Sequence, residues 1–197
     1  MADIKAFFLK NKDDIIKPIV VLLSICIVIA FALSLTNKIT AEKIAGLEAE
    51  NEQKTMSELI KAESFEKKSL DAVEYHIAKN GDETVGFIFV TSAKGYGGDV
   101  SVMTAVNTDG SIKAVAVLDA SNETPGLGQN VTKEKFYSQY EEKTADVKVV
   151  KNGAVSENNE INAVTGATIS SKAVTSAVNM ALENYKAVAE TEVAVNE

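Results

Sequence analysis

A run of hydroxyl-bearing and small residues near the end of the chain could bind or carry a phosphate group. Residues 162–171 read NAVTGATISS, and their hydroxyls belong to Thr165, Thr168, Ser170 and Ser171. A helix is predicted to begin here, and the free amides and dipole of a helix N-terminus favour a phosphate. The same residues also fit a plain turn at Gly166 followed by a serine cap. The pattern by itself leaves both interpretations open.

A second segment combines an acidic residue, a hydroxyl and two glycines. Residues 123–128 read ETPGLG. Pro125 followed by Gly126 predicts a type II turn, because proline presets φ at the second position and glycine accepts the positive φ of the third. A plain turn would explain this pair. The whole segment could instead wrap its backbone amides around a planar ligand: Glu123, Thr124, Pro125, Gly126, Leu127 and Gly128.

The two segments, in this order, resemble a known family. TGATISS is similar to the flavinylation motif of the FMN-binding domain in bacterial redox pumps. ETPGLG, preceded by the GYGG turn of residues 95–98 and a hairpin, resembles the G subunits of Rnf electron-transport complexes. The C subunit of the sodium-pumping NADH:quinone reductase is a close relative of these proteins. The resemblance extends over nearly the whole chain.

The resemblance implies that FMN is bound covalently, through a phosphoester, to the second threonine of the motif, Thr168. The rest of the motif is then expected to surround the cofactor: Thr165, Gly166, Ala167, Ser170 and Ser171. The 123–128 segment is expected to contact the flavin as well. A flavin transferase would attach the FMN from FAD after export, using its own magnesium, so no metal site is expected in this chain. The family commonly carries an aspartate where this chain has Asn162, which keeps the size but loses the charge.

The function that the resemblance implies is electron transfer. A protein of this kind relays electrons between neighbouring membrane subunits of an ion-translocating complex that links reduced ferredoxin to NAD. The chain shows neither a dinucleotide-binding fingerprint nor iron–sulfur cysteines, so no complete catalytic cycle is expected from it alone. The alternatives are the C subunit of the sodium-pumping quinone reductase and a tethered flavin-binding sensor. A structural or adhesive ectodomain, a third class, would carry no chromophore.

An uncharged apolar run near the N-terminus predicts a membrane anchor. As a helix, residues 18–35 would extend roughly 27 Å at about 1.5 Å per residue, close to a bilayer core of about 30 Å. A signal peptide is the alternative, but the run exceeds an h-region of about 7–15 residues and no small-x-small cleavage site follows. More lysines precede the run than follow it closely: Lys5, Lys10, Lys12 and Lys17 against Lys38 and Lys43. The positive-inside rule therefore predicts a single-pass protein of the cytoplasmic membrane, with its N-terminus in the cytoplasm.

Beyond the anchor, the pattern predicts an α+β fold with a mainly antiparallel sheet packed with helices. Strands are predicted at residues 84–91, 99–106, 111–118 and 147–150, and helices at 40–70, 132–140 and 170–188. Asp109-Gly110 predicts a hairpin turn. The predicted organisation is a short cytoplasmic N-terminus (1–17), a transmembrane helix (18–37), a helical stem (38–75), an extracytoplasmic FMN-binding domain (76–189) and a loose C-terminal tail (190–197).

Composition excludes several classes of function. The formal net charge of −8 argues against nucleic acid as a partner, because phosphates need a basic face. Cys26 is the one cysteine and His76 the one histidine, which excludes an intramolecular disulfide, a thiolate metal site and a multi-histidine metal site. The expected partners are the lipid bilayer, the other subunits of the Rnf complex and the flavin transferase.

Overall fold

The computed structural model describes residues 12–71, 73–144, 146–151, 153 and 159–195. Most of the predicted cytoplasmic segment, with Lys5 and Lys10, and the last two residues of the predicted tail lie outside this part of the chain. The chain divides into two compact units, Met1–Glu52 and Gln53–Glu197.

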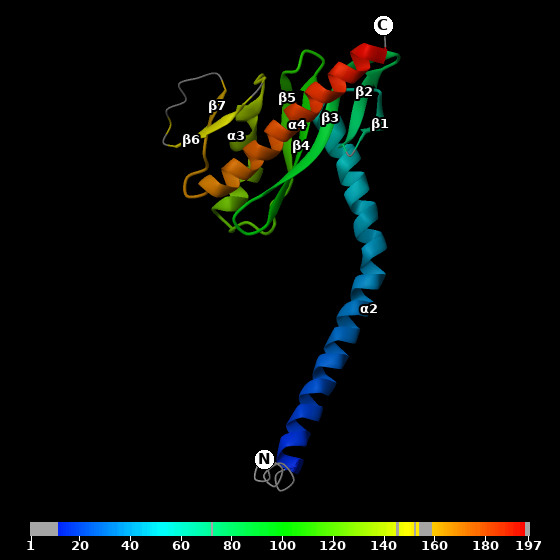
Figure 1. Ribbon diagram of the computed structural model, residues 1–197, viewed down its shortest axis with the longest axis vertical. Helices are drawn as coiled ribbons and strands as arrows, with labels where there is room; N and C mark the ends of the chain where they lie inside the picture. Colours follow the sequence, from blue (N-terminus) through cyan, green and yellow to red (C-terminus); the bar gives the residue numbers. More distant parts are fainter. Residues whose placement is uncertain (1–11, 72, 145, 152, 154–158, 196–197) are drawn as a thin grey trace. The chain divides into compact units, whose positions relative to one another are not determined.

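The first unit consists of most of one long helix, α2 (Lys12–Leu59), drawn in blue and cyan in Figure 1. Its stretch Ile16–Ala41 contains an 18-residue window with a mean hydropathy of 2.9, and none of that window is buried within the protein. The hydroxyls of Ser24 and Thr36 donate to the carbonyls four residues earlier, at 2.7 and 2.9 Å. In apolar surroundings no water is available, so polar groups must form their hydrogen bonds within the protein. The helix is thus long and apolar enough to cross a membrane, and it contains the predicted span 18–37.

The helix ends earlier than the sequence predicts. The predicted helix 40–70 and the stem to residue 75 are wrong beyond Leu59, because residues 64–70 form a strand, β1 (Ser64–Leu70), paired with β2 (Val73–Asn80). The helix-favouring residues Glu66, Lys67 and Lys68 occupy this strand, but two of them pair across the hairpin with residues of β2: Lys67 with Glu74 at 2.8 Å and Glu66 with Lys79 at 2.6 Å. Cross-strand pairing therefore overrides the local helix propensity.

The second unit contains a five-stranded antiparallel sheet in the order β1-β2-β3-β4-β5, which confirms the predicted α+β class. The three remaining strands agree with the prediction within a few residues: β3 (Glu83–Lys94), β4 (Asp99–Asn107) and β5 (Ile112–Asp119). Gly110 makes the predicted hairpin turn between β4 and β5 with φ +85°, and its amide donates to the carbonyl of Asn107 at 3.0 Å.

The C-terminal helix α4 (Thr168–Val195) lies across β3 and β4 and covers one face of the sheet (Figure 1). The apolar stripe predicted for this helix is buried against the sheet: Ala173, Val174, Ala177, Val178, Ala181 and Leu182. The hydroxyl of Thr91 on β3 donates to the carbonyl of Ala177 at 2.8 Å and joins the two layers. A smaller cluster around Ile88 and Met103 lies against the opposite face with Met56 and Ile60. Residues 190–195 continue the helix, so the prediction of a loose tail is wrong there.

Shorter elements lie beside α4 at its N-terminal end (Figure 1). They are the 3-10 helix η1 (Gly128–Thr132), α3 (Glu134–Tyr137), the 3-10 helix η2 (Ser138–Tyr140), and the parallel pair β6 (Lys148–Val150) and β7 (Glu160–Asn162). The predicted helix 132–140 is thus broken into short pieces, whereas the strand at 147–150 is confirmed. These elements bring the chain back to the start of α4.

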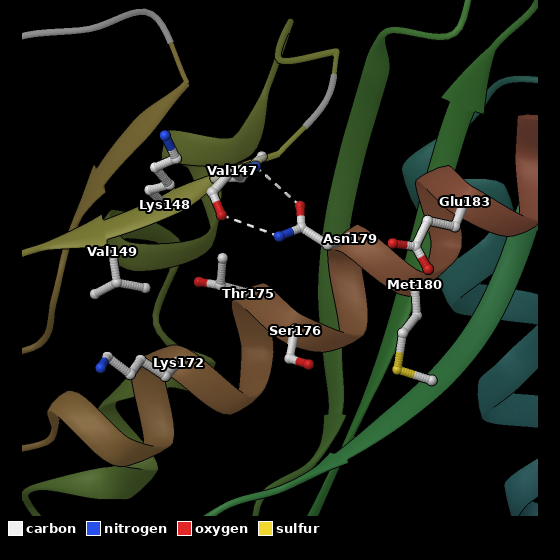
Figure 2. A pocket seen from close by; sticks show the side chains of 9 residues that line it. All are labelled: Val147, Lys148, Val149, Lys172, Thr175, Ser176, Asn179, Met180 and Glu183. Atoms are coloured by element: carbon white, nitrogen blue, oxygen red, sulfur yellow. Dashed lines mark hydrogen bonds between the residues drawn. The ribbon is translucent and has the colours of Figure 1, made fainter.

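Two amide side chains fasten β6 and β7. Figure 2 shows Asn179 of α4 bonded to both backbone groups of Val147: Nδ2 donates to the carbonyl, and Oδ1 accepts from the amide, each at 3.0 Å. Gln139 accepts from the amide of Asn162 at 2.8 Å and donates to its carbonyl at 3.3 Å. Each side chain thus satisfies a backbone donor and acceptor, which fixes the route of the chain into the 162–171 segment.

Candidate functional site

The 162–171 segment forms a tight turn that leads directly into α4. The amide of Ala167 donates to the carbonyl of Val164 at 2.9 Å, and Gly166 between them has φ +78°. This confirms the predicted turn at Gly166. The helix begins at Thr168, and the amide of Ser171 donates to the carbonyl of Ala167 at 3.0 Å. The expectation of a serine cap is therefore wrong: Ala167 occupies the N-cap position, and both serines lie within the first turn.

Ser171 closes this turn upon itself. Its hydroxyl accepts from the amide of Val164 and donates to the carbonyl of Ala167, both at 2.9 Å. The side chain is fully buried. Ser171 thus joins the first turn of the helix to the residues that precede it, although it accepts from no amide of the helix itself.

Ser170 points to a different part of the chain, the carboxylate of Glu123. Its hydroxyl donates to Oε2 of Glu123, and the amide of Gly97 donates to Oε1 at 2.9 Å. Glu123 is only 2% exposed. Burial raises the pKa of its carboxyl, but hydrogen bonds from Ser170 and from the backbone amides of residues 96–98 outweigh burial, so that the pKa lies below its ordinary value of 4.5. Glu123 is therefore ionised at neutral pH.

The glycines around Glu123 are required by the closeness of this packing. A Cβ at Gly97 would collide with the backbone carbonyl of Asn122. At Gly128 it would lie 2.7 Å from both Oε2 of Glu123 and Oγ of Ser170. Three segments therefore meet at one carboxylate: the 95–98 turn, the 123–128 loop and the first turn of α4. We refer to Gly97, Glu123, Gly128 and Ser170 as the carboxylate knot.

The middle of the 123–128 loop faces solvent. Thr124, Pro125, Gly126 and Leu127 are exposed, whereas Glu123 and Gly128 at the two ends are buried. The amide of Leu127 donates to the carbonyl of Thr124 at 3.1 Å, and Gly126 has φ +76°, which confirms the predicted type II turn. This turn touches the one before α4, because Cδ2 of Leu127 lies 3.1 Å from where a Cβ of Gly166 would be.

An open groove of about 920 Å³ borders the start of α4. The predicted site residues Thr165, Gly166 and Thr168 line it, whereas Ala167, Ser170 and Ser171 are buried behind it. The 123–128 loop does not line the groove but reaches its edge, where Nδ2 of Asn130 donates to the carbonyl of Gly126 at 2.6 Å. The other lining residues are Asn130, Lys133, Lys135, Phe136, Gln139, Lys151, Gly153, Asn162, Ala163 and Val164.

The groove is cationic in an acidic protein. It is lined by Lys133, Lys135 and Lys151 and by no acidic residue among those described, although the chain has 28 acidic and 20 basic residues. Asn162 also lines it, and its Oδ1 is buried without a hydrogen-bond partner among the described residues. A buried oxygen without a hydrogen-bond partner lowers the stability of a protein unless a donor group of a ligand bonds to it. A cluster of cations beside a helix N-terminus suits an anionic ligand, and a phosphate above all.

The three lysines and Gln139 are not among the site residues that the sequence predicts. Lys133 and Lys135 lie close together around the start of α3, which the TKEKF pattern could have suggested. Lys151 reaches the groove only through the β6–β7 pairing, for which the sequence carries no signal. No group of three or more histidine, cysteine, aspartate or glutamate side chains among the described residues could hold a metal ion.

Comparisons with known proteins identify relatives of this chain. Residues 95–183 match the FMN-binding domain family. Over 159 residues the chain is 36% identical to the G subunit of the proton-translocating ferredoxin:NAD(+) oxidoreductase complex of Clostridium ljungdahlii, covering 80% of this chain and 82% of the relative. Over 186 residues it is 36% identical to the Na(+)-translocating counterpart of Acetobacterium woodii, covering 84% and 89%. The crystal structure of Shewanella oneidensis NqrC, at 22% identity, superposes with a TM-score of 0.50 over 63% of this chain and 65% of that one, and so shares the fold.

Proposed function

Because this chain belongs to the family of G subunits of ion-translocating ferredoxin:NAD(+) oxidoreductase complexes, we propose that it is the electron-carrier subunit of such a complex, with its FMN bound covalently to Thr168. The observation that carries the assignment is the position of Thr168. It is the first residue of α4, and it lines the cationic groove.

The start of α4 suits the phosphate of FMN. The first amides of an α-helix have no partner within the helix, and Ala167 at the N-cap offers no side-chain acceptor to them. An anion at this point gains about 0.3–1 kcal/mol from the helix dipole. Lys133, Lys135 and Lys151 add positive charge along the groove, and the buried Oδ1 of Asn162 offers an acceptor to a ligand donor. The residues present therefore fit the cofactor.

The other hydroxyls of the motif are less suitable acceptors for the phosphoester. Ser170 is 2% exposed and Ser171 is fully buried, and both hydroxyls are engaged in hydrogen bonds within the protein. Thr165 is exposed and lines the groove, but it lies in the turn before the helix. Thr168 alone combines access to the groove with a place in the first turn of α4.

The attachment is a phosphoryl transfer from FAD. Oγ1 of Thr168 attacks the phosphorus of the FMN half of FAD and forms a new O–P bond. The pyrophosphate P–O bond breaks, AMP leaves, and the hydroxyl proton passes to a base of the transferase. The product is one covalent FMN and one AMP for each chain, with no change of oxidation state.

The bound FMN supplies redox chemistry, while the chain holds it in place and sets its electrostatic surroundings. We propose that it relays electrons between neighbouring subunits and does not accept hydride from NADH directly. The chain has no glycine-rich strand–helix turn followed by an acidic ribose ligand, which a nicotinamide site would need. Anaerobic stopped-flow reduction of the flavinylated chain tests this proposal. Inertness to NADH, with reduction restored by the partner membrane subunits, is expected; rapid and saturable bleaching by NADH alone would contradict it.

We propose that α2 is a single membrane span with the N-terminus in the cytoplasm and the second unit outside. The support is the apolar stretch Ile16–Ala41 together with the excess of lysines before it. Protease added to spheroplasts should digest the residues after the span. Complete protection of these residues until the spheroplasts are lysed would indicate the opposite orientation.

Two threonines of the same turn provide the decisive test of the attachment. Thr168→Val keeps the shape of the side chain but removes the nucleophile, and Thr165→Val makes the same change three residues earlier. Each variant is produced with the flavin transferase and scanned for flavin fluorescence in a denaturing gel, where only covalent flavin remains. We expect Thr168→Val to be dark and Thr165→Val to fluoresce like the wild type. The opposite pattern would move the attachment to Thr165.

A further inference from the structure

Glu123 is buried at a point where three separate segments of the chain meet. Its carboxylate is 2% exposed, accepts from the amide of Gly97 at 2.9 Å and receives the hydroxyl of Ser170 from 47 residues further along the chain. The glycines beside it leave room for no other group, because a Cβ at Gly97 or Gly128 would collide with Asn122 or with Glu123 itself. Both carboxylate oxygens are thus engaged by the protein.

The Ser170 bond fixes one side of the first turn of α4, and Ser171 fixes the other. Ser171 joins the turn to Val164 and Ala167, which precede it in the sequence. Ser170 joins the same turn to the 123–128 loop through Glu123. No side chain caps this helix end at Ala167, and an uncapped first turn frays readily. The two serines together hold Thr168, which lies two and three residues before them.

We propose that Glu123 is a positioning residue for Thr168: through Ser170 it holds the first turn of α4, and so holds the Thr168 hydroxyl where the phosphoester is formed. This inference rests on the proposed attachment of FMN to Thr168. Glu123 acts at a distance and does not touch the reacting atoms. A displacement of about 1 Å in a reacting group can lower a rate on the order of 10²-fold. Loss of the Glu123–Ser170 bond, which fixes one helical turn, should therefore have a measurable effect on the rate of flavin attachment.

The test is the rate at which the full-length chain accepts flavin. The chain in detergent is mixed with flavin transferase, FAD and magnesium, and covalent fluorescence is followed at several concentrations of the chain to separate kcat from KM. The variants are Glu123→Gln, Ser170→Ala and the double variant. The controls are Glu190→Gln and Ser176→Ala, which change exposed residues of α4. Thr168→Val is included to test the proposed attachment independently.

We expect Glu123→Gln and Ser170→Ala each to lower kcat at least tenfold with KM within twofold of the wild type. The double variant should be no slower than the slower single variant, because the two residues act through one bond. Wild-type kcat in both single variants, a change confined to KM, or multiplied effects in the double variant would overturn the proposal. If Glu123→Gln fails to fold, the kcat of Ser170→Ala alone tests the proposal, and a wild-type value would overturn it. Flavinylation of Thr168→Val would instead refute the proposed attachment site.

Discussion

The loops at the N-terminal end of α4 have two sides, and their polar groups are used in opposite ways. On one side, the carboxylate of Glu123 is buried and hydrogen-bonded to Gly97 and Ser170. On the other, the groove beside Thr168 is open, with three lysines and a buried Asn162 oxygen that has no partner among the described residues. The knot fixes the geometry of the first helical turn, whereas the groove leaves its polar groups for a ligand. Substitutions should therefore affect stability and the rate of cofactor attachment on the first side, and the properties of the bound cofactor on the second.

The largest loss of stability is expected in the knot, at Gly97. In Gly97→Ala the new methyl group would collide with the backbone carbonyl of Asn122, so the 95–98 turn must shift and its bond to Glu123 weakens. We expect the free energy of unfolding to fall by about 2–4 kcal/mol. Chemical unfolding of the full-length chain measures this change. Gly126→Ala, which meets no atom within 4 Å, is the control and should lose only about 1 kcal/mol through its positive φ. Equal losses in the two variants would show that the knot is not closely packed.

The charge of Glu123 should appear as a pH dependence of stability. Its pKa in the folded protein lies below the ordinary 4.5, so its stabilisation is fully present above that pH and is lost as the pH falls through the folded-state value. Glu123→Gln should cost about 2 kcal/mol at pH 7, and its difference from the wild type should shrink below pH 4.5. Subtracting the two profiles removes the contributions of Asp109 and Asp119, whose pKa values are also lowered. A difference that stays constant from about pH 7 to about pH 3 would contradict the assignment.

The exposed turn of the 123–128 loop lies between the two sides and should show both kinds of effect. Gly126→Val places a β-branched residue at φ +76°, where no neighbour is close, so the cost of about 1–2 kcal/mol comes from backbone strain. The flavin absorption spectrum should also change, because this loop is predicted to contact the cofactor. Gly81→Val, with φ +61° and equally open space in the β2–β3 turn, is the matched control. Wild-type flavin content and spectrum in Gly126→Val would refute the contact.

The smallest effect on stability is expected in the groove. Changing Lys133, Lys135 or Lys151 to Gln should alter the free energy of unfolding by no more than about 0.5 kcal/mol. The midpoint potential of the flavin should become more negative, because cations favour the reduced flavin with its greater negative charge. A shift on the order of 30 mV, or about 1.4 kcal/mol for a two-electron couple, is expected for the triple variant. It should diminish at high salt. Lys113→Gln on β5 is the control. An equal shift of the midpoint potential in that variant would show that the groove lysines have no specific effect on the flavin.

Local chemistry explains which features the sequence could predict. The turns at Gly126 and Gly166 and the apolar stripe of α4 each depend on residues within a few positions of one another, and all were predicted correctly. The sequence predicts a helix for strand β1 because Glu66, Lys67 and Lys68 favour one, whereas the partners of Glu66 and Lys67 lie on β2. The alternation of Val73, Tyr75 and Ile77 could have indicated β2.

The candidate site could be predicted only in part, for the same reason. The motif suggested Thr168, and Glu123 was expected at the cofactor. The bond between Glu123 and Ser170 spans 47 positions, and the three lysines converge only when α3 and the β6–β7 pair are in place. Such contacts depend on the tertiary fold, and one sequence contains no local signal for them.

The covalent attachment itself is tested most directly by peptide mass mapping. The full-length chain is purified from membranes of a host that contains the flavin transferase, digested, and fragmented to locate the modified residue. We expect one modified peptide, with the mass of FMN less one water on Thr168, and unmodified Thr165, Ser170 and Ser171. The added mass on any of these three residues, or a chain without any covalent flavin, would contradict it.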